Sequence, residues 1–363
     1  MKVVKNILLS LLMGATVATV LLTVLVAYSD RVDPATHPLL ACAGMTFPFF
    51  LVACLVLLVV WLVVSWRRSW VVLLGLLLTY PATRIYIPLH LSTAPPDGCI
   101  KLLSYNVAGF SMTHKLDHLQ DSVMAYLRLQ DADIVCLQEN FNTKPDTESA
   151  LKAMYPYNDT VHINSPSALI INSLSIHSRF PIVRKERIEY DSKSNGSVAF
   201  FLQVGEDTVV VVNNHLESTH LSSDDRLRYQ EMIGGGYDRE QTRKETRILL
   251  TKLCNAMAQR GPQTQAVHDF VSRHRQYPVI VCGDFNDTPL SFTRRTIAEG
   301  LTDCFVESGC GLGISFNQEG FYFRIDHILC SSHFRPYGCC VDSRMDASDH
   351  YPIFCWLQRL KDN

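Results

Sequence analysis

The chain has 363 residues, with 33 basic and 35 acidic side chains, and 47% of it is hydrophobic. Positions 1–98 hold six basic and three acidic residues, so the 27 basic and 32 acidic residues that follow carry a net charge of about −5. This balance disfavours a protein that grips long nucleic acids, because lysine and arginine contacts to phosphate supply much of their affinity. The composition also changes near residue 90, which indicates two unlike regions.

Two long apolar runs without charge open the chain, at 7–28 and 37–66. Each has the roughly 20 residues that a helix needs to cross a hydrocarbon core about 30 Å thick. A third run, 70–89, contains Pro81 and Arg84. We expect it to cross as well, with Arg84 reaching the interface, and the alternative is an interfacial or re-entrant segment. The predicted organisation is a membrane anchor over 1–90, a linker over 91–98 and a separate domain over 99–363.

Positive charges beside these runs predict their orientation. Lys2 and Lys5 precede the first run, and Arg67 and Arg68 lie between the second and the third. Because loops rich in lysine and arginine stay in the cytoplasm, three crossings would place everything after residue 90 on the periplasmic side of the cytoplasmic (inner) membrane. With two crossings the same domain would be cytoplasmic. A cleaved signal peptide is disfavoured because a second apolar run follows the first at once.

The twelve cysteines follow neither a metal-binding spacing nor a small disulfide framework. Those inside apolar runs are typical of small buried hydrophobic residues. Cys304 with Cys310, or one of the adjacent Cys339 and Cys340, could cross-link in an oxidising compartment. So many candidate free thiols argue mildly against an extracytoplasmic domain, and we give them less weight than the charge bias.

After residue 98, short apolar runs alternate with helical and loop patterns. Many of the runs are continuous, which is typical of strands covered on both faces. The predicted strands are 100–105, 134–138, 168–171, 198–204, 208–213, 279–282, 325–330 and 353–357. Apolar residues at helical spacing predict helices over 116–129 and 246–257.

Polar residues follow several of these strands directly. Taken singly, each has an ordinary explanation: an asparagine turn, a solvated glutamate or a satisfied core histidine. A carboxylate buried there without a partner would be costly, so it is either solvated or bound to a cation. Their repetition at successive strand ends weakens the ordinary explanations and predicts one shared site. The residues are Asn106, Gln138, Glu139, Asn213, His215, Asp284, Asn286, Asp326, His327, Asp349 and His350.

The order and spacing of this set resemble the endonuclease/exonuclease/phosphatase superfamily, which has the DNase I-like fold. The matching segments are Ser-Tyr-Asn106, Leu-Gln-Glu139, Asn213-x-His215, Gly-Asp284-Phe-Asn286, Arg-Ile-Asp326-His and Ser-Asp349-His350. The match covers residues 100–358, and the anchor makes the chain similar to a membrane-anchored bacterial-type member. The resemblance implies an α/β (α+β) fold, a four-layered sandwich of two packed β-sheets flanked by helices.

The resemblance also implies a divalent cation, Mg²⁺ or Mn²⁺. Glu139 would be its main carboxylate ligand, Asn106 would assist, and Asp349 would ligate the ion or hold a water. Hard oxygen ligands that leave several waters on the ion suit these two metals.

Catalytic roles follow from the same resemblance. Asp284 would orient or deprotonate the attacking water, and Asn286 would fix Asp284 or the phosphate. His215 and His350 would donate hydrogen bonds to the phosphoryl oxygens, with Asp326 holding the tautomer and charge of His350. These roles match what in-line attack on a phosphate needs, namely a positioned water and charge neutralisation.

Three features bear on the substrate. Asn213 and Arg179 are predicted to bind it, Arg179 because the segment 178–182 resembles the family's usual stretch between the glutamate and the middle histidine. Several nuclease members have a second acid two residues after the first asparagine, where this chain has Ala108, and this disfavours a two-metal repair nuclease. Residues 217–275 are longer than a strand connection needs, so they predict a lid, a substrate-reading insertion or a surface excursion without a role.

We therefore expect a metal-dependent phosphoester hydrolase, tethered to the membrane, that acts on lipid or small-molecule phosphodiesters. One alternative is an extracytoplasmic nuclease acting on DNA or RNA. It would use a basic cluster that is otherwise typical of a solvated helix, formed by Arg226, Arg228, Arg239, Arg243, Lys244 and Arg247. A third possibility is a non-catalytic phosphoester-binding protein. No protein partner is predicted.

Overall fold

The computed structural model describes residues 2–91, 93–110, 119–141, 145–163, 172–219, 221–318 and 320–360. Within these ranges the strands form two six-stranded sheets and one hairpin. The first sheet has the order β13 (Phe334–Val341), β14 (Ile353–Arg359), β1 (Ile100–Asn106), β2 (Ile134–Gln138), β4 (Ser173–Ser178) and β3 (Tyr157–His162). The second has the order β5 (Ile182–Ile188), β6 (Gly196–Val204), β7 (Asp207–His215), β8 (Val279–Asp284), β12 (Asp326–Cys330) and β9 (Thr302–Asp303). The hairpin pairs β10 (Phe316–Gln318) with β11 (Phe321–Phe323). The strand expected at 168–171 lies outside the described residues.

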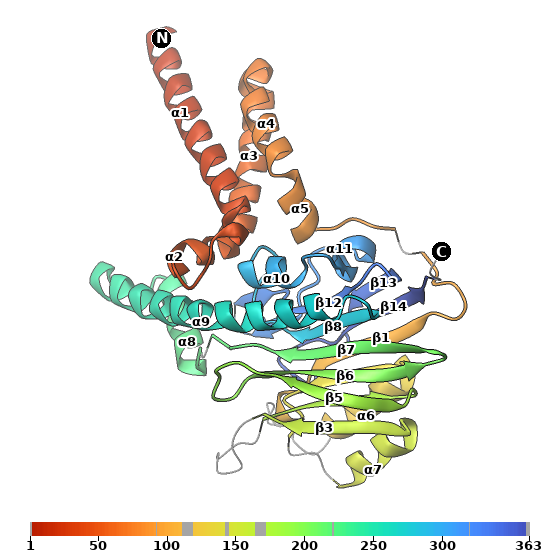
Figure 1. Ribbon diagram of the computed structural model, residues 1–363. Helices are drawn as coiled ribbons and strands as arrows, with labels where there is room; N and C mark the ends of the chain where they lie inside the picture. The colour runs from red at the N-terminus through yellow and green to blue at the C-terminus, as the bar shows by residue number, and fades with distance from the viewer. Residues whose placement is uncertain are drawn as a thin grey trace.

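The two sheets pack face to face, with helices on their outer faces (Figure 1). Side chains such as Leu102 and Val211 lie between the sheets, and their neighbours Leu103 and Val210 face outward into separate helix-covered clusters. The helices that cover the outer faces are α6 (Leu119–Gln130) and α7 (Pro145–Met154) on the first sheet and α9 (Arg239–Arg273) and α10 (Phe292–Ile297) on the second. The described part of the domain also contains α8 (Ser223–Ile233) and α11 (Cys304–Ser308). Both faces of each central strand are therefore buried, which explains the continuous apolar runs and confirms the expected four-layered sandwich.

Strand register brings the polar strand ends to one edge of the sandwich. β1 and β2 are parallel, with Asn106 beside Gln138, and β7 and β8 are parallel, with His215 beside Asp284. β12 runs antiparallel to β8 and begins where β8 ends, so Asp326 pairs with Asp284.

The N-terminal region forms helices that project from one side of the sandwich (Figure 1). These are α1 (Lys2–Ala27), α2 (Pro38–Ala41), α3 (Phe47–Ser65), α4 (Trp70–Leu78) and α5 (Tyr80–Tyr86). In the described residues, two helical segments are long and apolar enough to cross a membrane, Lys2–Arg31 and Pro38–Arg68. The third expected helix is divided into α4 and α5, which meet at Thr79, just before Pro81. A third crossing stays a prediction.

The predicted membrane anchor, residues 2–90 and called the anchor below, packs directly on the sandwich. Gly44 lies against the loop before α10, where a Cβ atom would come within 2.1 Å of the Leu290 carbonyl oxygen, so only glycine fits this approach. The buried Arg324 guanidinium donates to the carbonyl oxygens of Ile85, at 2.6 Å, and Leu312, at 2.7 Å. Arg324 therefore hydrogen-bonds carbonyl groups that the end of α5 leaves without a helical partner. It lies two residues before Asp326 in the sequence.

Candidate active site

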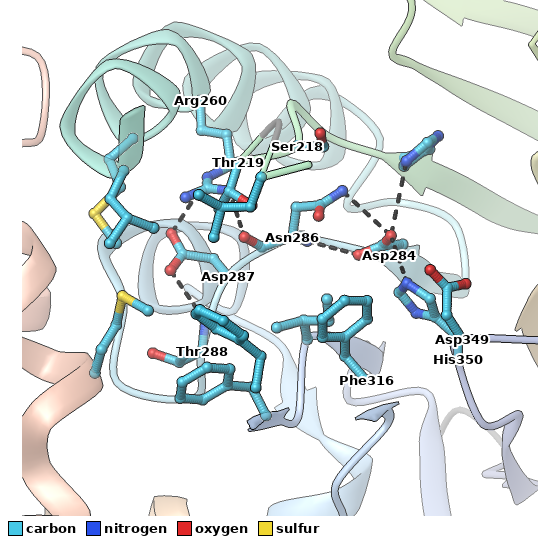
Figure 2. Close-up of a pocket in the computed structure, with 18 of the residues that line it drawn as sticks. Ser218, Thr219, Arg260, Asp284, Asn286, Asp287, Thr288, Phe316, Asp349 and His350 are labelled. Carbon is cyan, nitrogen blue, oxygen red and sulfur yellow. Dashed lines mark hydrogen bonds and ion pairs between the residues drawn. The ribbon is translucent and has the colours of Figure 1, made fainter. Parts of the chain in front are cut away.

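Asp284 lies at the centre of the polar residues and is only 1% exposed. Asn106 Nδ2 donates to its Oδ2 at 3.1 Å, and the Asn286 backbone N–H donates to its Oδ1 at 2.8 Å. The Nε2 atom of His215 lies 3.7 Å from Oδ2, and Nε2 of His350 lies at the same distance (Figure 2 labels Asp284 and His350). Burial raises the pKa of Asp284 to about 6, against the opposing charge of His350. A carboxylate with this pKa is a competent base at neutral pH.

Backbone geometry explains the Gly-Asp-Phe-Asn sequence around Asp284. Gly283 has φ 123°, and a Cβ atom there would come within 2.1 Å of the Asn214 carbonyl oxygen. Asn286 has φ 53° and Glu139 has φ 52°, so both lie in the left-handed region that residues other than glycine rarely occupy. Residues held in such conformations cluster at functional sites, where the surrounding structure offsets about 1–3 kcal/mol of strain each.

His350 is held by Asp326, with 2.8 Å between Nδ1 and Oδ2. Burial lowers the pKa of the imidazole, but the charges of Asp326 and Asp284 outweigh burial, so the pKa of His350 lies well above its ordinary value. Phe316 packs edge-on against the same ring, with 5.1 Å between the ring centres. His350 is therefore a buried imidazolium whose Nε2–H points toward Asp284.

His215 differs from His350 in charge. Burial lowers its pKa, with the charge of Asp284 opposing, so the ring is neutral near pH 7. Asn172 Nδ2 lies 3.2 Å from Nδ1 and donates to it, which places the ring proton on Nε2. That Nε2–H faces Glu139 Oε1 at 3.5 Å as well as Asp284.

Most of these side chains line a cavity of about 230 Å³, although Asn106, Asp326 and Asn172 are not among its lining residues. Its walls come from both sheets, from α9, from the β10–β11 hairpin and from the anchor. The lining residues are Met45, Glu139, His215, Ser218, Thr219, Leu221, Arg226, Leu253, Met257, Arg260, Asp284, Asn286, Asp287, Thr288, Phe316, Phe321, Phe323, Ile325, Asp349 and His350. One cavity thus holds most of the predicted site, together with an apolar wall that the sequence did not indicate.

A sequence model described as the Endonuclease/Exonuclease/phosphatase family matches residues 103–350, which is more than half of the chain. The chain belongs to this family. A second model, described as a domain of unknown function, matches residues 9–86 in the anchor. Among curated proteins, none matches the sequence.

Solved structures share the fold at low sequence identity. The human Nocturnin catalytic domain with bound sulfate anion is 16% identical, with a TM-score of 0.51 over 74% of this chain and 97% of that one. D. rerio TDP2 complexed with single strand DNA product is 15% identical, with a TM-score of 0.50 over 72% and 100%. Sphingomyelinase C from Streptomyces griseocarneus is 20% identical, with a TM-score of 0.49 over 72% and 99%. The first two show the fold, and the family assignment makes the chain a phosphoester hydrolase.

Members of the endonuclease/exonuclease/phosphatase family generally use divalent metals, and the residues of this site fit one. Glu139 and Asp349 line the same cavity and offer carboxylate oxygens there. Asn106 Nδ2 donates to Glu139 Oε1 at 3.2 Å, while its oxygen accepts from the Ala108 N–H at 3.0 Å and keeps a second lone pair. These oxygen donors and the surplus negative charge suit a hard cation.

Asp284, Asp326 and His350 form a second possible metal group, with ligand atoms within 4.8 Å of one another. This group is less suitable because both ring nitrogens of His350 already face carboxylates, Nδ1 at 2.8 Å from Asp326 Oδ2 and Nε2 at 3.7 Å from Asp284 Oδ2. Glu139, Asp349 and Asn106 are the better candidates.

Two residues that the sequence predicted to bind substrate, Asn213 and Arg179, do not line the cavity. Asn213 is fully buried between the sheets, where its Nδ2 donates to the carbonyl oxygens of Leu137 and Ser175 at 3.1 and 3.0 Å. Arg179 follows β4 at the opposite end of the sheet and pairs with Asp131 and Asp133. Asn213 therefore bridges the two sheets and Arg179 lies far from the cavity, so neither prediction of substrate binding fits the geometry.

Sequence reasoning also missed the buried Arg260, which lines the cavity from α9. Its Nη1 donates to the carbonyl oxygens of Glu217, at 2.9 Å, and Asn286. Its Nε lies 3.6 Å from Asp287 Oδ2. Arg260 thus fixes the backbone beside Asn286, and the acid directly after Asn286, Asp287, was the available signal for a buried basic partner.

Proposed function

We propose that the protein is a metal-dependent phosphodiesterase on the outer face of the cytoplasmic membrane, acting on lipid headgroups or small molecules near the outer leaflet. The observation that carries the proposal is one cavity that contains both the Asp284 cluster and Met45 of the anchor. A site built partly from the anchor acts at the membrane surface, and the acidic domain disfavours bulk nucleic acid.

The side chains divide the reaction between them. Asp284 orients the attacking water and takes its proton, consistent with its raised pKa. Asn286 holds Asp284 through its side chain as well as its backbone, with 3.2 Å between Nδ2 and Oδ2. His350 donates from Nε2 to a phosphoryl oxygen as negative charge develops, and the neutral His215 donates a second hydrogen bond. Asp326 keeps His350 protonated and oriented.

Glu139, Asp349 and Asn106 would hold Mg²⁺ or Mn²⁺, which when bound neutralises charge on the phosphate. Glu139, whose backbone is in the left-handed region with φ 52°, lines the cavity. Burial raises the pKa of Glu139, and a cation would oppose that shift by stabilising the ionised carboxylate.

Placement outside the membrane rests on charge and helix arrangement. The N-terminus, with Lys2 and Lys5, lies at the end of the anchor away from the sandwich (Figure 1). With α4 and α5 as a third crossing, the positive-inside bias puts that end in the cytoplasm and the sandwich outside. A reporter fused after Asn363 should be extracytoplasmic, and a cytoplasmic reporter would contradict the topology.

The nuclease alternative has weaker support. Among the described residues that line the cavity, Arg226 is the member of the basic cluster, whereas Arg239, Arg243 and Arg247 are exposed on α9. A nuclease should lose affinity steeply as salt rises, because binding releases counterions from the phosphates.

The test uses the full-length protein in detergent with phospholipids, small phosphodiesters, nucleotides, DNA and RNA, each with Mg²⁺ or Mn²⁺. We expect phosphodiester hydrolysis that EDTA abolishes. Glu139→Gln should raise the Mg²⁺ concentration for half-maximal activity roughly 10- to 100-fold, while Glu148→Gln, on the exposed face of α7, should not change it. Identical Mg²⁺ curves for the two variants would contradict the metal assignment.

A further inference from the structure

The cavity holds the reactive groups at one end, and its other end, called the apolar end here, combines large apolar side chains with Arg260, Asp287 and Thr288 (Figure 2). Asp284 and His350 lie at one end, and the ribbon of the anchor borders the other (Figure 2). The apolar end is lined by Met45 of the anchor, Leu253 and Met257 of α9, and Phe321 and Phe323 of β11. Hydrolysis of a small charged phosphoester does not require such a wall, so the wall indicates that the substrate also carries an apolar group.

The apolar wall is built from elements that already pack on one another. Met45, Leu253 and Met257 belong to one hydrophobic cluster, in which the anchor contacts α9. On the other side, Phe321 packs against Tyr229 of α8, with 4.8 Å between the ring centres. The wall is therefore largely preformed, as is usual for binding cavities, and its methionines can adapt to a flexible apolar ligand.

The wall also lies where the chain enters the membrane. Met45 is in the short helix η2 (Cys42–Thr46), directly before α3 begins at Phe47. Beside it, the anchor exposes apolar side chains that a bilayer would cover, with Leu39 60% and Phe49 72% exposed. The apolar lining at Met45 therefore lies within a few residues, along the chain, of helix surface that a bilayer would cover.

We propose that the apolar end binds the hydrocarbon chain next to the scissile phosphate, so that the substrate is an amphiphilic, lipid-type phosphodiester. The inference rests on the proposed function and extends it from bond type to substrate class. A volume of about 230 Å³ falls below the roughly 300–1,000 Å³ of pockets that enclose whole small molecules. The cavity therefore takes the phosphate and the first part of a chain, and the rest of the lipid stays in the bilayer.

The test compares two esters that share a leaving group, methyl and octyl p-nitrophenyl phosphate, with the full-length protein in detergent. Only the chain differs between them. We expect kcat/KM for the octyl ester to exceed that for the methyl ester by about tenfold or more, the ratio that burial of roughly two methylenes provides. Leu253→Gln and Met45→Gln should bring the ratio close to one. Leu250→Gln, one turn away on α9 and outside the cavity lining, should leave the ratio as in the parent protein.

The possible failures are distinguishable. If neither ester is hydrolysed with Mg²⁺ or Mn²⁺, the proposed function fails. If the methyl ester is hydrolysed but the ratio is one in the parent protein, or Leu253→Gln and Leu250→Gln change it equally, the chain site is wrong and the phosphodiesterase stands. Leu253→Gln could lose hydrolysis of both esters through misfolding, and Met45→Gln then tests the chain site. An unchanged octyl-to-methyl ratio of kcat/KM in Met45→Gln overturns the chain site.

Discussion

Both ends of the sandwich carry ion-paired aspartates, but the pairs at one end are exposed and those at the other end are buried. At the end away from the cavity, Arg179 Nη1 lies 3.1 Å from Asp133 Oδ1, and the same guanidinium pairs with Asp131. The Arg179 and Asp131 side chains there are 41% and 74% exposed. At the cavity end, Asp284 and Asp326 are each 1% exposed, and their ion-pair partners in the described part of the chain are histidines.

This difference shows that position in the fold, more than residue type, decides what a charged side chain does. An exposed pair keeps most of its hydration and contributes about 0.2–1 kcal/mol. Buried carboxylates lose hydration, so the Asp284 pKa rises, and a titratable histidine only partly compensates. Folding stability alone would favour arginine partners or apolar residues at these buried positions. The cluster of reactive groups therefore indicates a functional site.

The largest expected effect separates the two ends directly. Asp284→Asn removes the base but keeps the hydrogen-bonding shape, so kcat should fall by roughly 10²- to 10⁴-fold. Asp133→Asn makes the same chemical change at the other end and should leave kcat within assay error. Steady-state hydrolysis of a phosphodiester with saturating Mg²⁺ measures both variants. Equal losses would show that the comparison of the two ends is wrong.

A smaller effect should appear in the pH dependence of Asp326→Asn. The Asp326 charge raises the pKa of His350, and activity needs His350 protonated. Without that charge the imidazolium loses its proton at lower pH, so the alkaline limb of kcat/KM should move to lower pH. In the parent protein the acid limb should fall below about pH 6, where Asp284 becomes protonated. A pH–rate profile from 5 to 10 measures both limbs, and an alkaline limb that does not move would remove Asp326 from its proposed role.

The sequence predicted the central strands better than the edge strands. β7 and β8 were predictable because Val209–Val212 and the Val279–Cys282 run are buried on both faces. The edge strands β3 and β5 were missed because runs of charged and polar residues, including Asp159 and Lys185, occupy them, which protects an exposed edge. The helix expected at 246–257 is the middle of the 35-residue α9, which continues through Gly261 and Pro262. Packing of α9 on the second sheet outweighs those local breakers.

The candidate site was predictable to the extent that strand ends share an edge. His215 and Asn213 lie on the same face of β7, yet the first sheet covers Asn213 because it lies two residues farther from that edge. Sequence gives the face of a residue but not how far the neighbouring sheet extends over it. Met45 was beyond prediction for another reason, because its contact with Leu253 joins segments more than 200 positions apart.

The smallest expected effect tests the exposed end. Arg179→Ala removes both of its ion pairs, and because the side chain is 41% exposed, we expect a loss of only about 0.2–1 kcal/mol in the free energy of unfolding. For a domain of this size, that corresponds to a fall in Tm of about 4 °C at most, measurable by thermal unfolding of the full-length protein. Phosphodiesterase activity should be unchanged, since the guanidinium lies at the opposite end of β2 from Glu139. A tenfold or larger loss of kcat/KM with an unchanged Tm would mean that the substrate also contacts the exposed end, and the division between a structural and a catalytic end would fail there.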